Sequence, residues 1–182
     1  VEPFVMQALL RREPGPGIAL LETLQKRDEA AGSPGRTSID LNLYLGNLRR
    51  LAGDTKGAAR NDQAALAELQ VELTKQPGNA DIHSYLAQAY CGLGDRTKAT
   101  THAAIAVETV PTTTDALSGA YYLDIQARVW ARFADRNAIP AIEALLKHPA
   151  PTPLTPALLR LDPDFDKLRT DARFKALAGG AP

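Results

Sequence analysis

Residues 80–111 read ADIHSYLAQAYCGLGDRTKATTHAAIAVETVP and contain two helical patterns with one break between them. The first pattern covers residues 80–93 and ends at Gly94, and the second covers residues 97–109 and ends before Pro111. Glycine commonly ends a helix in a left-handed conformation, and proline disfavours helix at the residue before it. Two short helices joined by a tight turn predict a helical hairpin.

Small and large residues alternate in this stretch as two packed helices require. Ala87 and Ala99 fall where the helices would cross, and only small side chains permit a close approach there. Leu86 and Tyr90 would fill the space between the helices. His83 stands where a large side chain would pack, and no metal-ligand spacing surrounds it. We therefore interpret His83 as a packing residue and expect both alanines to be buried.

The same pattern occurs twice more along the chain. An upstream copy has the matching residue types 41 residues earlier, at Leu45, Gly46, Gly53, Asp54, Ala58 and Ala65. A degenerate copy follows 40 residues after the central one, at Ala127, Trp130, Ala134, Asp135 and Ile139. The extra residues of the upstream copy predict that its second helix is longer and runs to Gln76. The extra residues before the downstream copy are expected in the loop PTTTDALSG.

The central stretch resembles a tetratricopeptide repeat along its full length, without a gap. The signature positions fall on His83, Leu86, Ala87, Tyr90, Gly94, Ala99, Ala103, Ala106 and Pro111. Residues 38–180 are also similar to the C-terminal repeat region of bacterial signalling proteins, which often ends in a segment like residues 153–179. The N-terminal parts of such proteins are serine/threonine kinase, nucleotide cyclase or winged-helix domains. The resemblance implies a sensor or scaffold module.

Helical patterns also flank the repeats. Two helices are expected at 3–12 and 17–31, with the breaker Pro14-Gly15-Pro16-Gly17 between them and a turn at 33–35. Helices at 116–133 and 138–147 make up the third hairpin, and a proline-rich loop at 149–156 precedes short helices near 156–161 and 164–178. Residues 156–178 should cap the third hairpin through Leu158, Leu161, Phe165, Leu168 and Phe174.

We therefore predict one all-α domain over residues 1–182, an α-solenoid of tetratricopeptide-like helical hairpins. It comprises an N-terminal helical pair (1–37), repeats at 38–78, 79–112 and 113–148, and a C-terminal helical cap (149–182). Terminal caps are expected because each hairpin leaves an apolar face that a neighbour must cover. The prediction is more than about 65% helix and no sheet, against roughly a third helix in ordinary globular proteins.

Composition narrows the classes of function. The 21 basic and 21 acidic residues balance, which argues against a nucleic-acid partner. No long uncharged apolar stretch exists, so we expect no membrane insertion by this segment. The chain starts at Val1 without the features of a signal peptide, and we interpret it as a piece of a longer protein or a processed product. The cellular side, cytoplasmic or periplasmic, stays open.

No catalytic or cofactor motif is present, so the sequence predicts neither an enzyme nor a cofactor. Asp162, Asp164 and Asp166 have the spacing that opens a calcium loop, but Lys167 and Arg173 stand where that loop needs Gly and Glu. An acidic helix start that complements the helix dipole is the favoured reading. The single cysteine, Cys91, excludes an internal disulfide and carries no sign of a reactive thiolate.

In tetratricopeptide repeats the first helix of each hairpin lines a concave groove. Carried over, the resemblance implies a peptide-binding groove lined by Asp40, Asn47, Arg50, Asp81, Ser84, Gln88, Tyr121, Asp124, Arg128 and Arg132. The middle repeat contributes no cation, which argues against a clamp for the carboxylate of a chaperone tail. Two readings of the third repeat stay open: a solvated helix face with an Asp124–Arg128 pair, or a mixed-charge groove with Tyr121 as an aromatic anchor.

The predicted function is to bind a protein or peptide partner. Two alternatives stay open. One is an oligomerisation module for an attached enzyme, which would make the protein a homo-oligomer. The other is a helical sensor for a small molecule or lipid, which a deep closed apolar pocket would favour over an open groove.

Overall fold

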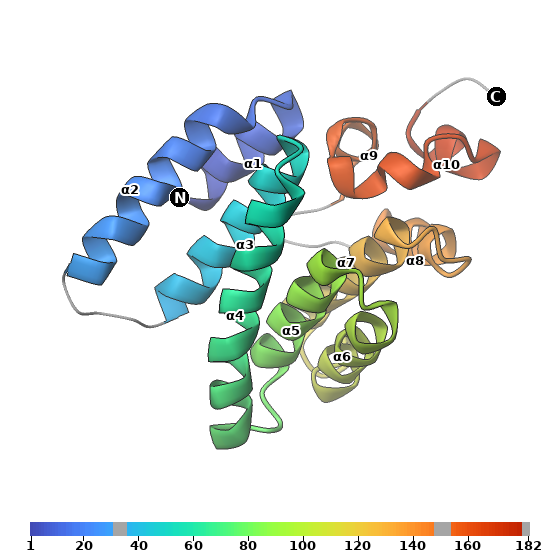
Figure 1. Ribbon diagram of the computed structural model, residues 1–182. Helices are drawn as coiled ribbons and strands as arrows, with labels where there is room; N and C mark the ends of the chain where they lie inside the picture. The colour runs from blue at the N-terminus through green and yellow to red at the C-terminus, as the bar shows by residue number, and fades with distance from the viewer. Residues whose placement is uncertain (31–35, 148–153, 180–182) are drawn as a thin grey trace.

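The computed structural model describes residues 1–30, 36–147 and 154–179, and within these ranges it is all-helical with no strand (Figure 1). Helix makes up 80% of the described residues, which confirms the all-α part of the predicted fold class. The helices are α1 (Glu2–Arg11), α2 (Pro14–Ala30), α3 (Arg36–Leu51), α4 (Thr55–Lys75), α5 (Ala80–Leu93), α6 (Arg96–Thr109), α7 (Ala116–Arg132), α8 (Ala138–Leu145), α9 (Pro156–Leu161), the 3₁₀ helix η1 (Pro163–Leu168) and α10 (Ala172–Leu177). The turn expected at 33–35 and the loop over 149–153 lie outside the described residues.

A Gly-Asp pair builds each of the first two hairpin turns. Gly53 and Gly94 follow α3 and α5 with φ of 82° and 79°, in the left-handed region that favours glycine. The next residues, Asp54 and Asp95, accept hydrogen bonds from backbone N–H groups in the first turns of α4 and α6, at 2.8 and 3.0 Å. The turn is therefore encoded locally, which explains why the sequence predicts these boundaries closely.

Helices that are neighbours in sequence pack side by side. The most extensive contacts pair α3 with α4 and α5 with α6, and α4 against α5 and α6 against α7 join one pair to the next (Figure 1). Ala87 and Ala99 are fully buried, as predicted for crossing positions. α4 is seven residues longer than α6 and ends at Lys75 with Gln76 as its cap, which confirms the expected extension.

His83 is a packing residue, as expected. It is 5% exposed, and its ring stacks on His102 at a centroid distance of 5.1 Å. The His102 ring stacks in turn on Tyr90, and His83 Nε2 lies 2.9 Å from the carbonyl oxygen of Pro77. The imidazole thus fills the interhelical space that a larger aromatic side chain would occupy.

One boundary differs from the sequence prediction. Pro14-Gly15-Pro16-Gly17 lies in the first turn of α2 rather than between α1 and α2. Proline is tolerated there because the first N–H groups of a helix have no intrahelical partner. The helix predicted from residue 116 is confirmed, since Asp115 caps α7 and residues 116–119 are helical, so only residues 111–115 of the stretch PTTTDALSG precede the helix.

The C-terminal cap packs on α7 and α8. Leu159, Phe165, Leu168 and Phe174 are buried in one apolar cluster with residues of both helices, and Leu158 packs against it. The expectation that Leu161 also docks is wrong, since it is 48% exposed and Leu159 is buried instead. Pro163 starts a 3₁₀ helix right after α9, with Asp162 between the two as its cap. None of the described helices combines the length and apolar character needed to cross a bilayer.

Candidate binding surface

The predicted groove residues lie on α3, α5 and α7, and α5 contacts both α3 and α7. We divide this surface into two parts. The cationic end comprises Asn47, Arg50, Arg128 and Arg132, in the later halves of α3 and α7. The tyrosine end comprises Tyr44, Tyr85 and Tyr121, one from each of the three helices.

The structure brings the cationic end together across two helices. The Asn47 side-chain oxygen accepts hydrogen bonds from Arg50 Nη1 at 3.0 Å and from Arg132 Nη1 at 3.3 Å. Asn47 and Arg50 belong to α3, whereas Arg132 belongs to α7. The repeat alignment therefore places these three residues correctly on one surface.

The C-terminal cap covers this cationic end. Arg128 Nη1 donates to Asp162 at 2.5 Å and to Asp164 at 3.2 Å, while Arg128 Nε donates to Asp124 at 2.7 Å. The guanidinium also lies 5.3 Å from the centre of the Phe165 ring. The Asp124–Arg128 pair exists as expected, but the Arg128 side chain is only 16% exposed and so does not lie on a solvated face.

Sequence reasoning missed the part that the cap plays here. The expected acidic helix start is confirmed, because Asp162 caps η1 and Asp164 and Asp166 lie in its first turn. In addition, Asp162 and Asp164 pair with Arg128, which the sequence did not predict. Arg132 Nη1 also lies 3.8 Å from Asp164 Oδ1. The arginines on two of the predicted groove helices and an acidic segment later in the chain were a usable signal for this pairing.

A second buried carboxylate neutralises Arg50. Asp62, on α4, forms an ion pair with Arg50, and its side chain is 2% exposed. Burial raises the pKa of Asp62 to about 6, although Arg50 and Arg132 act in the opposite direction. Gly46 and Gly92 lie against this carboxylate, and a Cβ at either position would overlap with it. These two glycines therefore make room for a buried ion pair.

Cys91 lines a cavity of about 380 Å³ beside these charges, together with Arg50, Arg132 and Asp164. The thiol is buried, and this burial raises its pKa above the ordinary value. A thiol with a raised pKa is a poor nucleophile at neutral pH. The geometry thus supports the structural role that the sequence suggested.

Two predicted groove residues in α5 are less accessible than expected. Ser84 is fully buried and donates a hydrogen bond to the backbone oxygen of Asp81 at 2.8 Å. Gln88 is half-buried and lies 3.4 Å from the backbone oxygen of Ser84. Asp81 accepts a hydrogen bond from the Tyr122 hydroxyl at 2.9 Å, which connects α5 to α7. The partly exposed residues on this side of α5 are therefore Gln88, Asp81, which was also predicted, and Tyr85, which was not.

The tyrosine end remains open. Tyr121 is 43% exposed, and Tyr44 and Tyr85 are half-buried. The Tyr121 hydroxyl is nevertheless enclosed enough that desolvation, with Tyr85 nearby, raises its pKa to about 12. Burial also raises the pKa of Tyr44, and the carboxylates of Glu2 and Asp40 reinforce the shift. Sequence reasoning missed Tyr44 and Tyr85, although they share the 41-residue offset of the two repeats.

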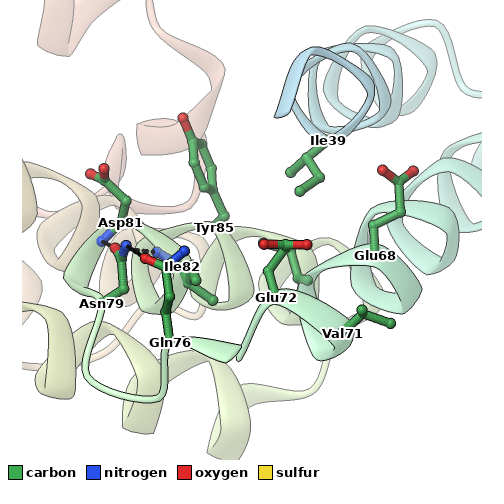
Figure 2. A pocket seen from close by; sticks show the side chains of 10 residues that line it. Ile39, Glu68, Val71, Glu72, Gln76, Asn79, Asp81, Ile82 and Tyr85 are labelled. Atoms are coloured by element: carbon green, nitrogen blue, oxygen red, sulfur yellow. Dashed lines mark hydrogen bonds between the residues drawn. The ribbon is translucent and has the colours of Figure 1, made fainter. Parts of the chain in front are cut away.

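A pocket of about 540 Å³ adjoins the tyrosine end where α4 extends beyond the length of α6 (Figure 2). We call it the α4 pocket, and its lining residues are Ile39, Glu68, Leu69, Val71, Glu72, Gln76, Asn79, Asp81, Ile82 and Tyr85. Figure 2 shows the side chains of Glu68, Asp81 and Tyr85 standing on the same open side of the pocket, with Ile39 between them. The pocket therefore combines apolar and acidic groups.

No family model matches the chain, and no curated protein or solved structure shows significant similarity to it. The tetratricopeptide resemblance and the signalling context therefore remain predictions from the sequence. What the protein can bind has to be argued from the geometry of this surface.

Proposed function

We propose that the protein is a tetratricopeptide-type module that binds a segment of a partner protein at the tyrosine end. The observation that supports this is the alignment of Tyr44, Tyr85 and Tyr121 on three adjacent helices, with Tyr121 43% exposed. Tyrosine is enriched in interfaces because it buries a large rigid surface and keeps a polar hydroxyl. A peptide lying across the three helices would contact all three rings.

The cationic end is a poor alternative site. The cap already supplies its counter-charges, and Asp162 is 2% exposed beneath Arg128. A ligand that displaced the cap would also uncover Phe165 and Phe174, which are at most 1% exposed. Burying these rings stabilises the cap by several kcal/mol, roughly 1.5–3 per side chain. The ligand surface is therefore the tyrosine end.

In this proposal the protein holds a partner and does not transform it. The role that the resemblance implies is that of a sensor or scaffold in a bacterial signalling protein. Binding at an open surface formed by rigid helices fits such a role, because the helices are ordered before the partner arrives.

Selection of peptides from a phage-displayed library of random sequences tests the proposal. We expect the protein to select peptides whose binding is lost in Tyr85→Ala and in Tyr121→Ala. Leu161→Ala is the matched control, since Leu161 is 48% exposed but lies on the cap, away from the tyrosine end. Peptides that bind all three variants equally would show that the tyrosine end is not the site.

A further inference from the structure

We propose that a second site, the cavity of about 380 Å³ beside Cys91, binds a small organic carboxylate. We call it the cap cavity, because η1 of the cap forms one side of it and residues of α1, α3, α5 and α7 form much of the rest. Its volume lies in the range of small-molecule sites, roughly 300–1,000 Å³. The site goes beyond the proposed function, since it takes a small molecule and lies at the cationic end. Such a ligand fits beside the docked cap, whereas a peptide would have to displace it.

Arg132 brings hydrogen-bond donors to the cap cavity that the protein itself does not use. A guanidinium has about five N–H donors. Among the described residues, Arg132 donates one hydrogen bond, from Nη1 to the Asn47 side-chain oxygen at 3.3 Å. Its nearest carboxylate oxygen, on Asp164, is 3.8 Å away, which is too far for a hydrogen bond. The Arg132 side chain is only 19% exposed, so solvent satisfies the remaining donors in part, and an acidic oxygen in the cavity would satisfy them fully.

Lys167 is a cation of the same lining without a counter-charge. It belongs to η1 and is exposed, so the cavity reaches solvent beside it. The described part of the chain gives its ammonium group neither an ion pair nor a hydrogen bond. Arg50, the other basic residue of the lining besides Arg132, is by contrast held by Asp62 and Asn47. The charge available to a ligand is therefore that of Lys167.

The carboxylates around the cavity are already balanced. Asp164 and Asp166 line it, and Asp166 accepts hydrogen bonds from Arg12 at 3.0 Å and from Arg169 at 2.7 Å. In the ion-pair network of the described residues around the cavity, five arginines share five carboxylates, those of Asp62, Asp124, Asp162, Asp164 and Asp166. Lys167 adds one positive charge to this balance, so a ligand with one negative charge neutralises the site and a dianion exceeds it.

The remaining lining suits an apolar body behind the charged group. Leu9, Leu51 and Phe133 are half-buried residues of the cavity, and covering their exposed surface is favourable. A carboxylate is planar and accepts two parallel hydrogen bonds from a guanidinium, which matches the free donors of Arg132. Chloride and other simple inorganic anions lack the apolar body, so the lining favours an organic acid over them.

The experiment is a titration of the whole ¹⁵N-labelled chain with phenylacetate, followed by NMR. We expect saturable shifts of the backbone amide signals of Gly92, Gly94 and Phe133, which line the cavity. Phenylacetamide has the same shape without the charge, and it should bind about tenfold more weakly or worse, because the hydrogen bonds to Arg132 lose their charge assistance. Phenyl phosphate, a dianion at neutral pH, should bind more weakly than phenylacetate.

Two variants test the two basic residues separately. Arg132→Gln should weaken phenylacetate binding about tenfold or more, and Lys167→Gln about two- to fivefold, since an exposed charge contributes less. Lys175→Gln is the matched control, because Lys175 is an exposed lysine of the cap outside the cavity lining, and it should leave binding unchanged. Circular dichroism and thermal melting establish that each variant is folded. If Arg132→Gln does not fold, the comparison of Lys167→Gln with Lys175→Gln decides.

Several results would overturn the proposal. These are the absence of saturable shifts at the cavity, equal binding of phenylacetate and phenylacetamide, and equal binding of phenylacetate to Lys167→Gln and Lys175→Gln. Tighter binding of phenyl phosphate than of phenylacetate would overturn the assignment to a carboxylate. None of these results bears on peptide binding at the tyrosine end, so the proposed function stands or falls by its own experiment.

Discussion

Ala134 adopts a left-handed conformation with φ of 51°, at the turn where the first two repeats have glycine. A Cβ in this region costs roughly 1–2 kcal/mol, partly offset by the smaller entropy that alanine loses on folding. We therefore expect Ala134→Gly to raise the free energy of unfolding by up to about 1 kcal/mol.

The converse change provides the control. Gly94→Ala should lower the free energy of unfolding by a similar amount, because Gly94 has φ of 79°. An added Cβ would meet no atom within 4 Å, so the change reports backbone strain and not a steric clash. Urea unfolding of both variants measures the effect. A destabilising Ala134→Gly would show that this backbone position is not strained by its side chain.

Asp62 gives the stability of the protein a defined pH dependence. Its pKa in the folded protein is about 6, raised from an ordinary value of 3.8. Between these values the folded state binds a proton that the unfolded state does not, so this group stabilises the protein as pH falls from 7 towards 4. Asp62→Asn removes the effect. Relative to that variant, we expect the natural protein to gain stability at pH 4.5 compared with pH 7 in urea unfolding, whereas a difference that stays constant or shrinks would contradict the raised pKa.

At the scale of the elements, single mutations can distinguish the docked side chains of the C-terminal cap from its exposed ones. Phe165 is fully buried and Leu161 is 48% exposed, although they are four residues apart. Phe165→Ala should lower the free energy of unfolding by about 3–5 kcal/mol through loss of burial and a residual cavity. Leu161→Ala should change it by less than about 0.5 kcal/mol. If the two variants changed the free energy of unfolding equally in thermal or urea unfolding, the cap would not be docked as the structure shows.

The sequence predicts elements well where the signals are local. The Gly-Asp turns after α3 and α5 depend on a left-handed glycine and an aspartate cap, and both can be recognised without knowing the neighbours. The length of helix α4 is predicted in another way, since it follows from the offset between two copies of one pattern.

The candidate site was predicted only in part, because it depends on contacts between distant segments. The alignment places Asn47, Arg50 and Arg132 together, but it contains no information on where the cap lies. Asp162 reaches Arg128 over a sequence separation of 34 residues, and that contact decides which half of the groove stays open. The error at Leu161 has the same origin, because contacts with the distant helices α7 and α8 decide that Leu159 of α9 is buried.

At the scale of the whole molecule, one ion pair connects the two ends of the chain. Arg12 follows α1, and its guanidinium contacts both oxygens of Asp166 in η1, at 3.0 and 2.5 Å. Both side chains are more than 40% exposed, so the interaction should contribute no more than about 1 kcal/mol. A double-mutant cycle with Arg12→Gln and Asp166→Asn measures this coupling. Arg128→Gln, which leaves Asp162 buried and without its main partner, should instead cost about 3–5 kcal/mol.

The length of α4 has a consequence for how such a protein can gain or lose a binding pocket. Its seven extra residues relative to α6 turn through about 700°, only about 20° short of two full revolutions. An insertion of this size keeps the phase of the helix, so the face that packs on α3 and α5 continues unrotated. Four or ten residues would have turned that face by tens of degrees and disrupted the next hairpin. A heptad thus behaves as a modular unit, which evolution or an engineer can exchange while the remaining helices keep their register.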